Sequence, residues 1–157
     1  YSRYEKYFES DGLYWLQYGL SLRSFNRQKE AYDRLATAYN AYPHDHTIHA
    51  FAQQKLILAA SELTSDDLAK QYMDEAVQML GKLDQFFESD DTYPIVTLAE
   101  GHVRVLRRIK GDSIARVKAV EYVNDLSRRL KNCPNSRLEK SRLKLMDYAA
   151  SGVWKLD

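Results

Sequence analysis

Three histidines at the start of a predicted helix give the chain its clearest pattern of possible metal ligands. His44, His46 and His49 follow a His-x-His-x-x-His spacing, and one helical turn would bring the last two toward a single ion. Zinc needs a third or fourth ligand and groups that orient the ligands, and Asp45 is the local candidate. We interpret the histidines as exposed residues of a turn, with Asp45 capping the helix, and predict no metal site.

Motifs for catalysis are missing from the sequence. It has no glycine-rich phosphate loop, no nucleophile elbow and no His-Glu-x-x-His pair of metal ligands. Cys133 is the single cysteine, and it follows a predicted helix, where the dipole of the helix disfavours a reactive thiolate. We therefore predict a non-catalytic chain without a cofactor, and any enzymatic activity would lie in an upstream domain.

Basic side chains gather in the second part of the sequence. Residues 1–94 hold 9 Lys and Arg against 15 Asp and Glu, a net charge of −6, whereas residues 95–157 hold 14 against 7, a net charge of +7. A basic face suits phosphate groups or an acidic partner, although helix C-termini also favour cations for reasons of stability. The candidate residues for an anion-binding patch are Arg104, Arg107, Arg108, Arg137, Lys140 and Lys144.

The composition is that of an ordinary folded domain. The 157 residues are 45% apolar and 29% charged, which suits one domain with a real core. Gly and Pro are scarce, at 6 and 3, which favours helices joined by short turns over a β fold. No apolar run approaches the roughly 18 residues that cross a bilayer, so we predict no membrane contact. The lone cysteine fits a cytoplasmic setting.

Breaks in the apolar periodicity divide the chain into helices. The clearest breaks fall at 26–27, 42–45, 89–94 and 132–135, with weaker ones at 63–66 and 110–112. Between them apolar residues recur every three or four positions, as they do on half-buried helices. We predict an all-α fold of about seven helices, the later ones near 46–62, 66–88, 94–110, 112–132 and 136–155. Residues 1–10 look like the stub of a helix from an upstream region.

Residues 12–45 resemble a tetratricopeptide repeat, a pair of antiparallel helices about 34 residues long. The matching positions, counted from Gly12, are Trp15 at the large aromatic site, Gly19 at the close helix crossing, Ala31 and Ala38 at small sites, Leu35 at a large apolar site, and Pro43 at the terminating turn. Gly19 and Ala31 lack bulk, so two helix backbones can approach each other there, and Pro43 would stop the second helix.

The remainder of the chain resembles the repeat in architecture only. Segments 46–88 and 94–132 are predicted as degenerate repeats whose second helices are long, and the helix at 136–155 would cap the stack. A repeat cannot bury both of its faces alone, so stacking is expected. The resemblance implies a single domain over 1–157, built of antiparallel helical hairpins stacked as a right-handed superhelix.

The resemblance also implies a protein-protein interaction scaffold or sensor module of a larger protein. Tetratricopeptide proteins bind in a groove lined near the second, fifth, ninth and twelfth positions of each unit. In this sequence, with counterparts in later repeats, these are Leu13, Leu16, Leu20, Arg23, Thr47, Gln54, Ile95, Leu98 and His102. We expect a protein or peptide partner, which includes other domains of the same chain.

Two wider interpretations stay open. Residues 14–22, followed by Tyr42-Pro43-His44-Asp45, are similar to the C-terminal repeat regions of bacterial multidomain signalling and defence ATPases of the STAND type. Repeats in those proteins act as sensors or oligomerisation surfaces beside an effector domain. The alternative function is binding of nucleic acid or another acidic partner through the basic residues of 104–144. The sequence does not indicate an oligomeric state.

Overall fold

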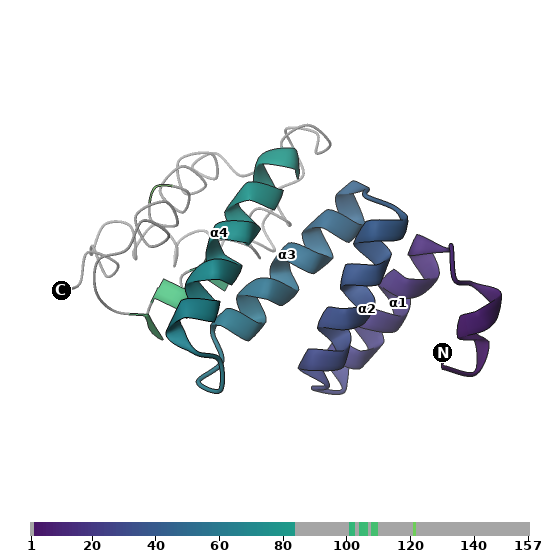
Figure 1. The fold of residues 1–157 in the computed structure, drawn as a ribbon, viewed down its shortest axis with the longest axis horizontal. Helices are drawn as coiled ribbons and strands as arrows, with labels where there is room; N and C mark the ends of the chain where they lie inside the picture. The colour runs from purple at the N-terminus through teal and green to yellow at the C-terminus, as the bar shows by residue number, and fades with distance from the viewer. Residues whose placement is uncertain (1, 84–100, 103, 107, 110–120, 122–157) are drawn as a thin grey trace, which may run out of the picture.

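The structure, a computed structural model, describes residues 2–83 together with 101, 102, 104–106, 108, 109 and 121. These residues form a 3-10 helix, η1 (Ser2–Tyr7), and four α-helices, α1 (Gly12–Ser24), α2 (Gln28–Ala41), α3 (Asp45–Ala59) and α4 (Asp66–Leu83) (Figure 1). Residues 101, 102, 104–106 and 108 are also helical. The described part of the chain has no strand, which confirms the all-α prediction.

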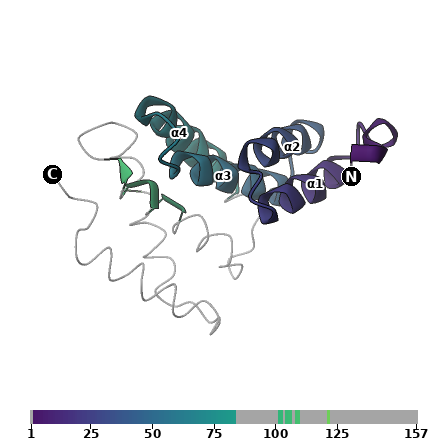
Figure 2. The ribbon, with the colours of Figure 1, turned by 90° about the horizontal axis from the view of Figure 1, so that it is seen from below.

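The four α-helices form two hairpins that lie side by side. α1 packs on α2, α3 packs on α4, and α2 packs against α3. Figure 2 shows two layers, with α1 and α3 on one side of the molecule and α2 and α4 on the other. The core between them is apolar and includes Trp15, Leu35, Ala38, Ile48, Phe51, Leu56, Ala69 and Met73. The predicted helices at 112–132 and 136–155 lie outside the described residues.

A left-handed residue ends α1 at the predicted break. Asn26 has a φ of 59°, and its N–H donates to the carbonyl of Arg23 at 3.0 Å. The N–H of Arg27 donates to the carbonyl of Leu22 at 2.9 Å. This pair of bonds is the Schellman motif, whose left-handed position accepts Gly or Asn. The break predicted at 26–27 is therefore confirmed.

The two helices of the first hairpin approach most closely at Gly19. A Cβ atom on Gly19 would lie 2.6 Å from Cγ of Leu35 and 3.2 Å from its backbone nitrogen. Leu35 and Ala31 are both fully buried. The close helix crossing predicted at Gly19 is thus confirmed, and a larger side chain would force α1 and α2 apart.

The N-terminal segment folds back on the first hairpin. Nε1 of Trp15 donates to the carbonyl of Glu9 at 3.0 Å, and Arg34 of α2 pairs with Glu5 at 3.2 Å. The guanidinium of Arg34 also lies over the ring of Trp15, at 5.3 Å, and over that of Tyr18, at 5.2 Å. A cation over aromatic faces is stabilised by their quadrupoles. Residues 2–9 and α2 therefore hold Trp15 from two sides.

The start of α3 differs by one residue from the prediction. His44, not Asp45, is the N-cap, and its N–H donates to Oγ1 of Thr47 at 2.9 Å. Asp45 is the first helical residue, and its carboxylate accepts from the N–H of His46 at 2.8 Å. The prediction that Asp45 caps this helix was therefore wrong by one position. Thr47, whose hydroxyl accepts this hydrogen bond at the N-cap, is buried.

Candidate binding face

Several side chains of α1 and α3 are accessible to solvent, and the two helices lie in the same layer of the structure (Figure 2). They recur every three or four residues, so each set lies along one side of its helix. We define the α1–α3 face by Leu13, Gln17 and Leu20 of α1 and His49, Gln53 and Ile57 of α3. Leu13 and Gln17 are exposed, and the other four are half-buried.

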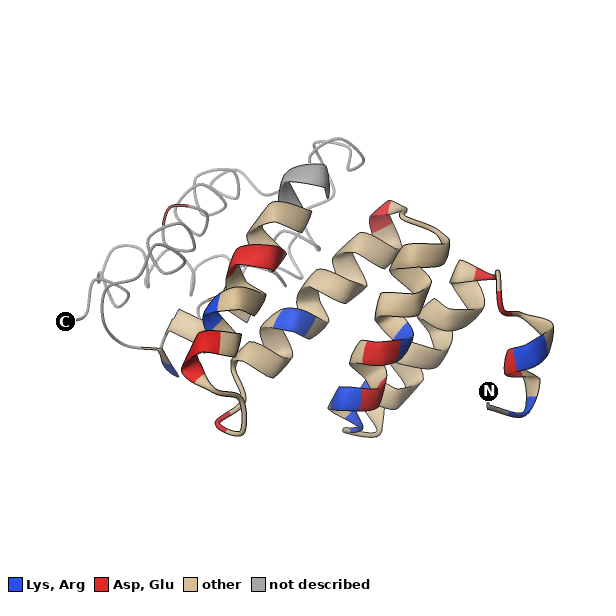
Figure 3. Cartoon of the chain, in the orientation of Figure 1, with Lys and Arg blue, Asp and Glu red and all other residues tan. Residues whose placement is uncertain are grey.

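The α1–α3 face carries no Asp, Glu, Lys or Arg. Helices α1 and α3 contain only Arg23, Asp45 and Lys55 of these types. Figure 3 shows both helices as almost wholly uncharged ribbons, whereas α2 and α4 carry bands of both signs. Since Arg23 is held by protein oxygens and Asp45 lies at the start of α3, the face offers a partner apolar and amide groups.

Arg23 joins the two hairpins. Its Nε donates to Oε1 of Gln54 at 2.7 Å, Nη1 to Oε1 of Gln53 at 2.5 Å, and Nη2 to the carbonyl of Ala50 at 2.7 Å. The amide of Gln54 in turn donates to the carbonyl of Gln28 at 2.9 Å. Hydrogen bonds from a charged donor are roughly twice as strong as neutral ones. The network thus ties α1 to α3 and satisfies a glutamine that is fully buried.

The structure divides the predicted groove residues into two sets. Leu13 is 55% exposed and Leu20 is half-buried, so both reach the surface. Arg23 is half-buried in the network described above. The remaining described residues are buried in the fold, namely Leu16 (5% exposed), Thr47 (1%), Gln54 (0%) and His102 (0%). Ile95 and Leu98 lie outside the described residues.

A shift of one position between the hairpins explains why the predicted α3 positions are buried. A repeat of about 34 residues, counted from Gly12, would start its second unit at His46. α3 begins instead at Asp45, one position earlier. An error of one position turns a helical side chain by about 100°, which moves it from the surface to the core. The predicted positions Thr47 and Gln54 are therefore buried, whereas the preceding residues, His46 and Gln53, are accessible.

Alignment of α1 and α3 at their first residues identifies equivalent core positions in the two hairpins. Ile48 takes the place of Trp15, and the two are 2% and 6% exposed. Ala52 takes the place of Gly19 and is fully buried. Sequence reasoning missed Gln17, His49, Gln53 and Ile57, although counting from the first residue of α3 could have found His49 and Gln53.

The predicted histidine cluster forms the turn into α3. The ring of His44 stacks on Tyr42, with 5.2 Å between ring centres, and its Nδ1 pairs with Asp45 when the imidazole is protonated. The ring of His46 lies 5.9 Å from that of His44. Among the described residues, no three His, Cys, Asp or Glu side chains are placed to hold a metal ion. His49 belongs instead to the α1–α3 face.

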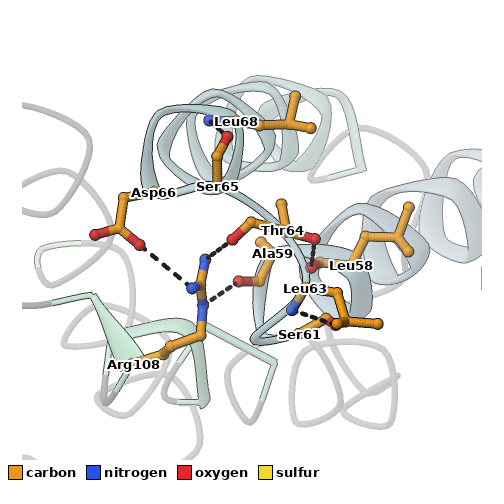
Figure 4. Close-up of polar contacts among 9 residues, drawn as sticks. All are labelled: Leu58, Ala59, Ser61, Leu63, Thr64, Ser65, Asp66, Leu68 and Arg108. Atoms are coloured by element: carbon orange, nitrogen blue, oxygen red, sulfur yellow. Dashed lines mark hydrogen bonds and ion pairs between the residues drawn. The ribbon is translucent and has the colours of Figure 1, made fainter.

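Arg108, a predicted anion-binding residue, binds oxygen atoms of the protein itself through its guanidinium group. Nε donates to the carbonyl of Ala59 at 2.9 Å and Nη2 to that of Thr64 at 2.9 Å (Figure 4). Nη1 pairs with Asp66 at 3.3 Å, and the side chain is 17% exposed. A cation at a helix C-terminus satisfies free carbonyls and opposes the negative end of the dipole. Arg108 thus stabilises the end of α3 and the turn before α4.

The other predicted patch residues are not brought together in the described part of the chain. Arg104 is exposed, and it lies in the same helical stretch as Arg108. Arg107, Arg137, Lys140 and Lys144 lie outside the described residues. An anion-binding patch therefore stays a prediction, and Arg108 contributes to stability instead.

Comparisons with known proteins gave no match, whether with protein-family models, with curated proteins or with solved structures. None of the helices in residues 2–83 is long and apolar enough to span a bilayer. The function of the chain is consequently inferred from the α1–α3 face and from the packing that presents it.

Proposed function

We propose that the chain is a tetratricopeptide-like helical scaffold that binds a protein or peptide segment on the α1–α3 face. It acts without catalysis, as an interaction module of a larger protein in the reducing cytoplasm. The proposal is supported by the two neighbouring hairpins, since they place the first helix of each pair in one layer and the second in the other (Figure 2). Stacked helix pairs of this kind use such a layer for binding.

The observation that carries the proposal is an accessible face without fixed charge that spans both hairpins. Leu13 is 55% exposed on α1, Leu20 is half-buried on the same helix, and Ile57 is half-buried on α3. The network of Arg23 with Gln53 and Gln54 fixes one helix against the other. A rigid apolar surface needs less ordering when a partner binds, and this favours affinity.

The residues of the face define the chemistry of the partner. Leu13, Leu20 and Ile57 suit an apolar side chain that serves as an anchor. The side-chain amide of Gln17 carries donors and an acceptor that can pair with a peptide backbone, and Gln53 offers the donors of its NH2 group, since its oxygen accepts from Arg23. We therefore expect an extended or helical segment with apolar anchors and few charges.

Selection from a random peptide library displayed on phage tests this proposal. The immobilised chain is expected to enrich peptides with apolar anchors and few charges. Binding of a selected peptide, measured by calorimetry, should weaken at least about tenfold in Leu13→Asp and in Leu20→Asp, because a carboxylate would be desolvated beneath the anchor. Leu63→Asp is the matched control, since Leu63 is 94% exposed in the turn before α4.

Salt dependence separates this function from binding of an acidic partner. Apolar binding on the α1–α3 face should change little with ionic strength. Association of phosphate-rich or acidic ligands with basic side chains weakens steeply as salt rises. Selected peptides that are acidic and salt-sensitive, or binding that the Leu13 and Leu20 variants leave unchanged, would contradict the proposal.

A further inference from the structure

A lysine lies at a core position of the second hairpin. When α1 and α3 are aligned at their first residues, Lys55 of α3 takes the place of Leu22 of α1, which is 4% exposed and part of the apolar interior. Lys55 is almost as buried, at 5%. Transfer of an ammonium group out of water is unfavourable unless partners replace the water. The surroundings of Lys55 must therefore be built for a cation.

Three aromatic rings and one carboxylate surround the ammonium of Lys55. Nζ lies 4.3 Å from the ring centre of Phe51, 5.1 Å from that of Tyr32 and 5.4 Å from that of Tyr72. It also lies 2.5 Å from Oε2 of Glu75 and 3.1 Å from the hydroxyl of Tyr32. All ring distances fall within the roughly 6 Å over which a ring face attracts a cation.

The three rings and the carboxylate around Nζ of Lys55 form a cage, and three helices contribute to it. Tyr32 comes from α2, Phe51 from α3, and Tyr72 and Glu75 from α4. The ring of Tyr32 lies 5.1 Å from that of Phe51 and 5.5 Å from that of Tyr72, so the rings support one another. Gln71 donates to the second oxygen of Glu75 at 2.7 Å, which fixes the carboxylate. The walls of the cage are thus held by contacts that do not involve Lys55.

We propose that Tyr32, Phe51, Tyr72 and Glu75 form an ammonium-binding site whose resident ligand is the side chain of Lys55. The site takes a primary alkylammonium ion, because two of its three N–H donors meet Glu75 and Tyr32 while ring faces surround the cation. Glu75 is 34% exposed and opens the cage to solvent on one side. With its ligand in place, the cage locks α2 of the first hairpin to both helices of the second.

Removal of the resident ligand and addition of a free amine test the site. Lys55→Ala empties the cage by removing three methylene groups and the ammonium, and n-propylammonium supplies a stem and an ammonium of that length. Ligand that binds only the folded state should raise the melting temperature of Lys55→Ala by roughly 3–6 °C at ten times its dissociation constant. If Lys55→Ala is unfolded without ligand, the amine should restore its helical circular dichroism signal.

Four controls isolate the cage from general effects of the salt. The native chain and Lys55→Met, in which side chains fill the space, should not respond to n-propylammonium. Neutral n-propanol should not replace the amine, because it carries no charge for the rings or for Glu75. The double variant Lys55→Ala/Glu75→Gln should respond less. The absence of rescue in Lys55→Ala, equal rescue by n-propanol, or an equal response of Lys55→Met would overturn the proposal.

Discussion

In each of the two hairpins, the two helices are held together by different kinds of contact. In the first, Gly19 lets α1 approach α2 directly, and residues 25–27 form a short turn. In the second, Ala52 stands at the equivalent position, and residues 60–65 form a longer turn. Polar side chains compensate there, because Lys55 pairs with Glu75 and Arg108 holds the turn. The predicted repeat pattern matches the sequence well in the hairpin where small side chains make the contact, and poorly in the hairpin where polar side chains contribute to it.

The sharpest difference between the hairpins should appear at their closest contacts. Gly19→Ala is expected to lower the free energy of unfolding by about 3 kcal/mol, since the new Cβ would collide with buried Leu35. Ala52→Gly should cost only about 1 kcal/mol, through loss of helix propensity. Denaturation in urea measures both changes.

A double-mutant cycle checks the cause of the Gly19 effect. Leu35→Ala alone leaves a cavity, but it also makes room for a Cβ at position 19. The cost of Gly19→Ala should therefore shrink in the Leu35→Ala background. Additive costs would show that the collision with Leu35 is not the cause.

Arg23, which joins the two hairpins, and Arg108, which holds the turn of the second hairpin, should stabilise the fold by similar amounts. Arg23→Met and Arg108→Met are each expected to lower the free energy of unfolding by about 2 kcal/mol, because each removes charge-assisted hydrogen bonds to the protein. Arg104→Met is the matched control, since Arg104 is exposed in the same helical stretch as Arg108. It should change stability by less than about 0.5 kcal/mol. Equal effects at positions 104 and 108 would contradict the role of Arg108.

Acid should weaken the second hairpin through Glu75. Desolvation opposes ionisation of Glu75, but hydrogen bonds from Lys55 and Gln71 outweigh it, so the pKa of Glu75 lies below its ordinary value of 4.5. A lowered folded-state pKa means that the charged carboxylate stabilises the fold above pH 4.5, and that this contribution is lost as the pH falls through the folded-state pKa.

Glu75→Gln isolates that contribution. The variant should lose about 1 kcal/mol at neutral pH, because a charged acceptor is replaced by a neutral one. Its stability should then depend less on pH in the acid range than that of the native chain. Asp67→Asn, which changes an exposed acid at the start of the same helix, provides the comparison. If the loss of stability in acid were the same in Glu75→Gln as in the native chain, Glu75 would not be its cause.

The smallest effect is expected at the turn that ends α1. Asn26 has a positive φ, which glycine adopts without strain and alanine adopts at a cost. Asn26→Gly should change stability by only about a few tenths of a kcal/mol, and Asn26→Ala should lower it by about 1 kcal/mol. Thermal unfolding of the two variants measures the difference. Equal melting temperatures would show that the left-handed geometry is not needed.

Much of the fold within residues 2–83 could be predicted from the sequence. Breaks at 26–27 and 42–45 separate the helices correctly, because turn chemistry is local. The close contact at Gly19 is predictable because glycine weakens a helix. A glycine inside a predicted helix therefore indicates a place where two backbones approach each other. The all-α class follows from the apolar periodicity.

The candidate site was harder to predict because it depends on register and on partners distant in sequence. α3 begins one position earlier than the predicted repeat of about 34 residues would place it, so the predicted groove positions of α3 lie in the core. Arg108 binds the carbonyls of Ala59 and Thr64, which are remote in sequence, so its spacing alone suggested a surface patch. The pairing of Phe51 with Lys55 on one helix gave no indication that Tyr32 and Tyr72 would complete a cage.

The location of peptide binding tests the proposed function most directly. A selected peptide can be titrated into the isotopically labelled chain while backbone amide signals are followed by nuclear magnetic resonance. We predict that the largest shifts cluster on the α1–α3 face, at Leu13, Gln17, Leu20, His49, Gln53 and Ile57. Shifts centred on Leu63, on Arg104 or on α2 and α4 would contradict a binding surface formed by α1 and α3.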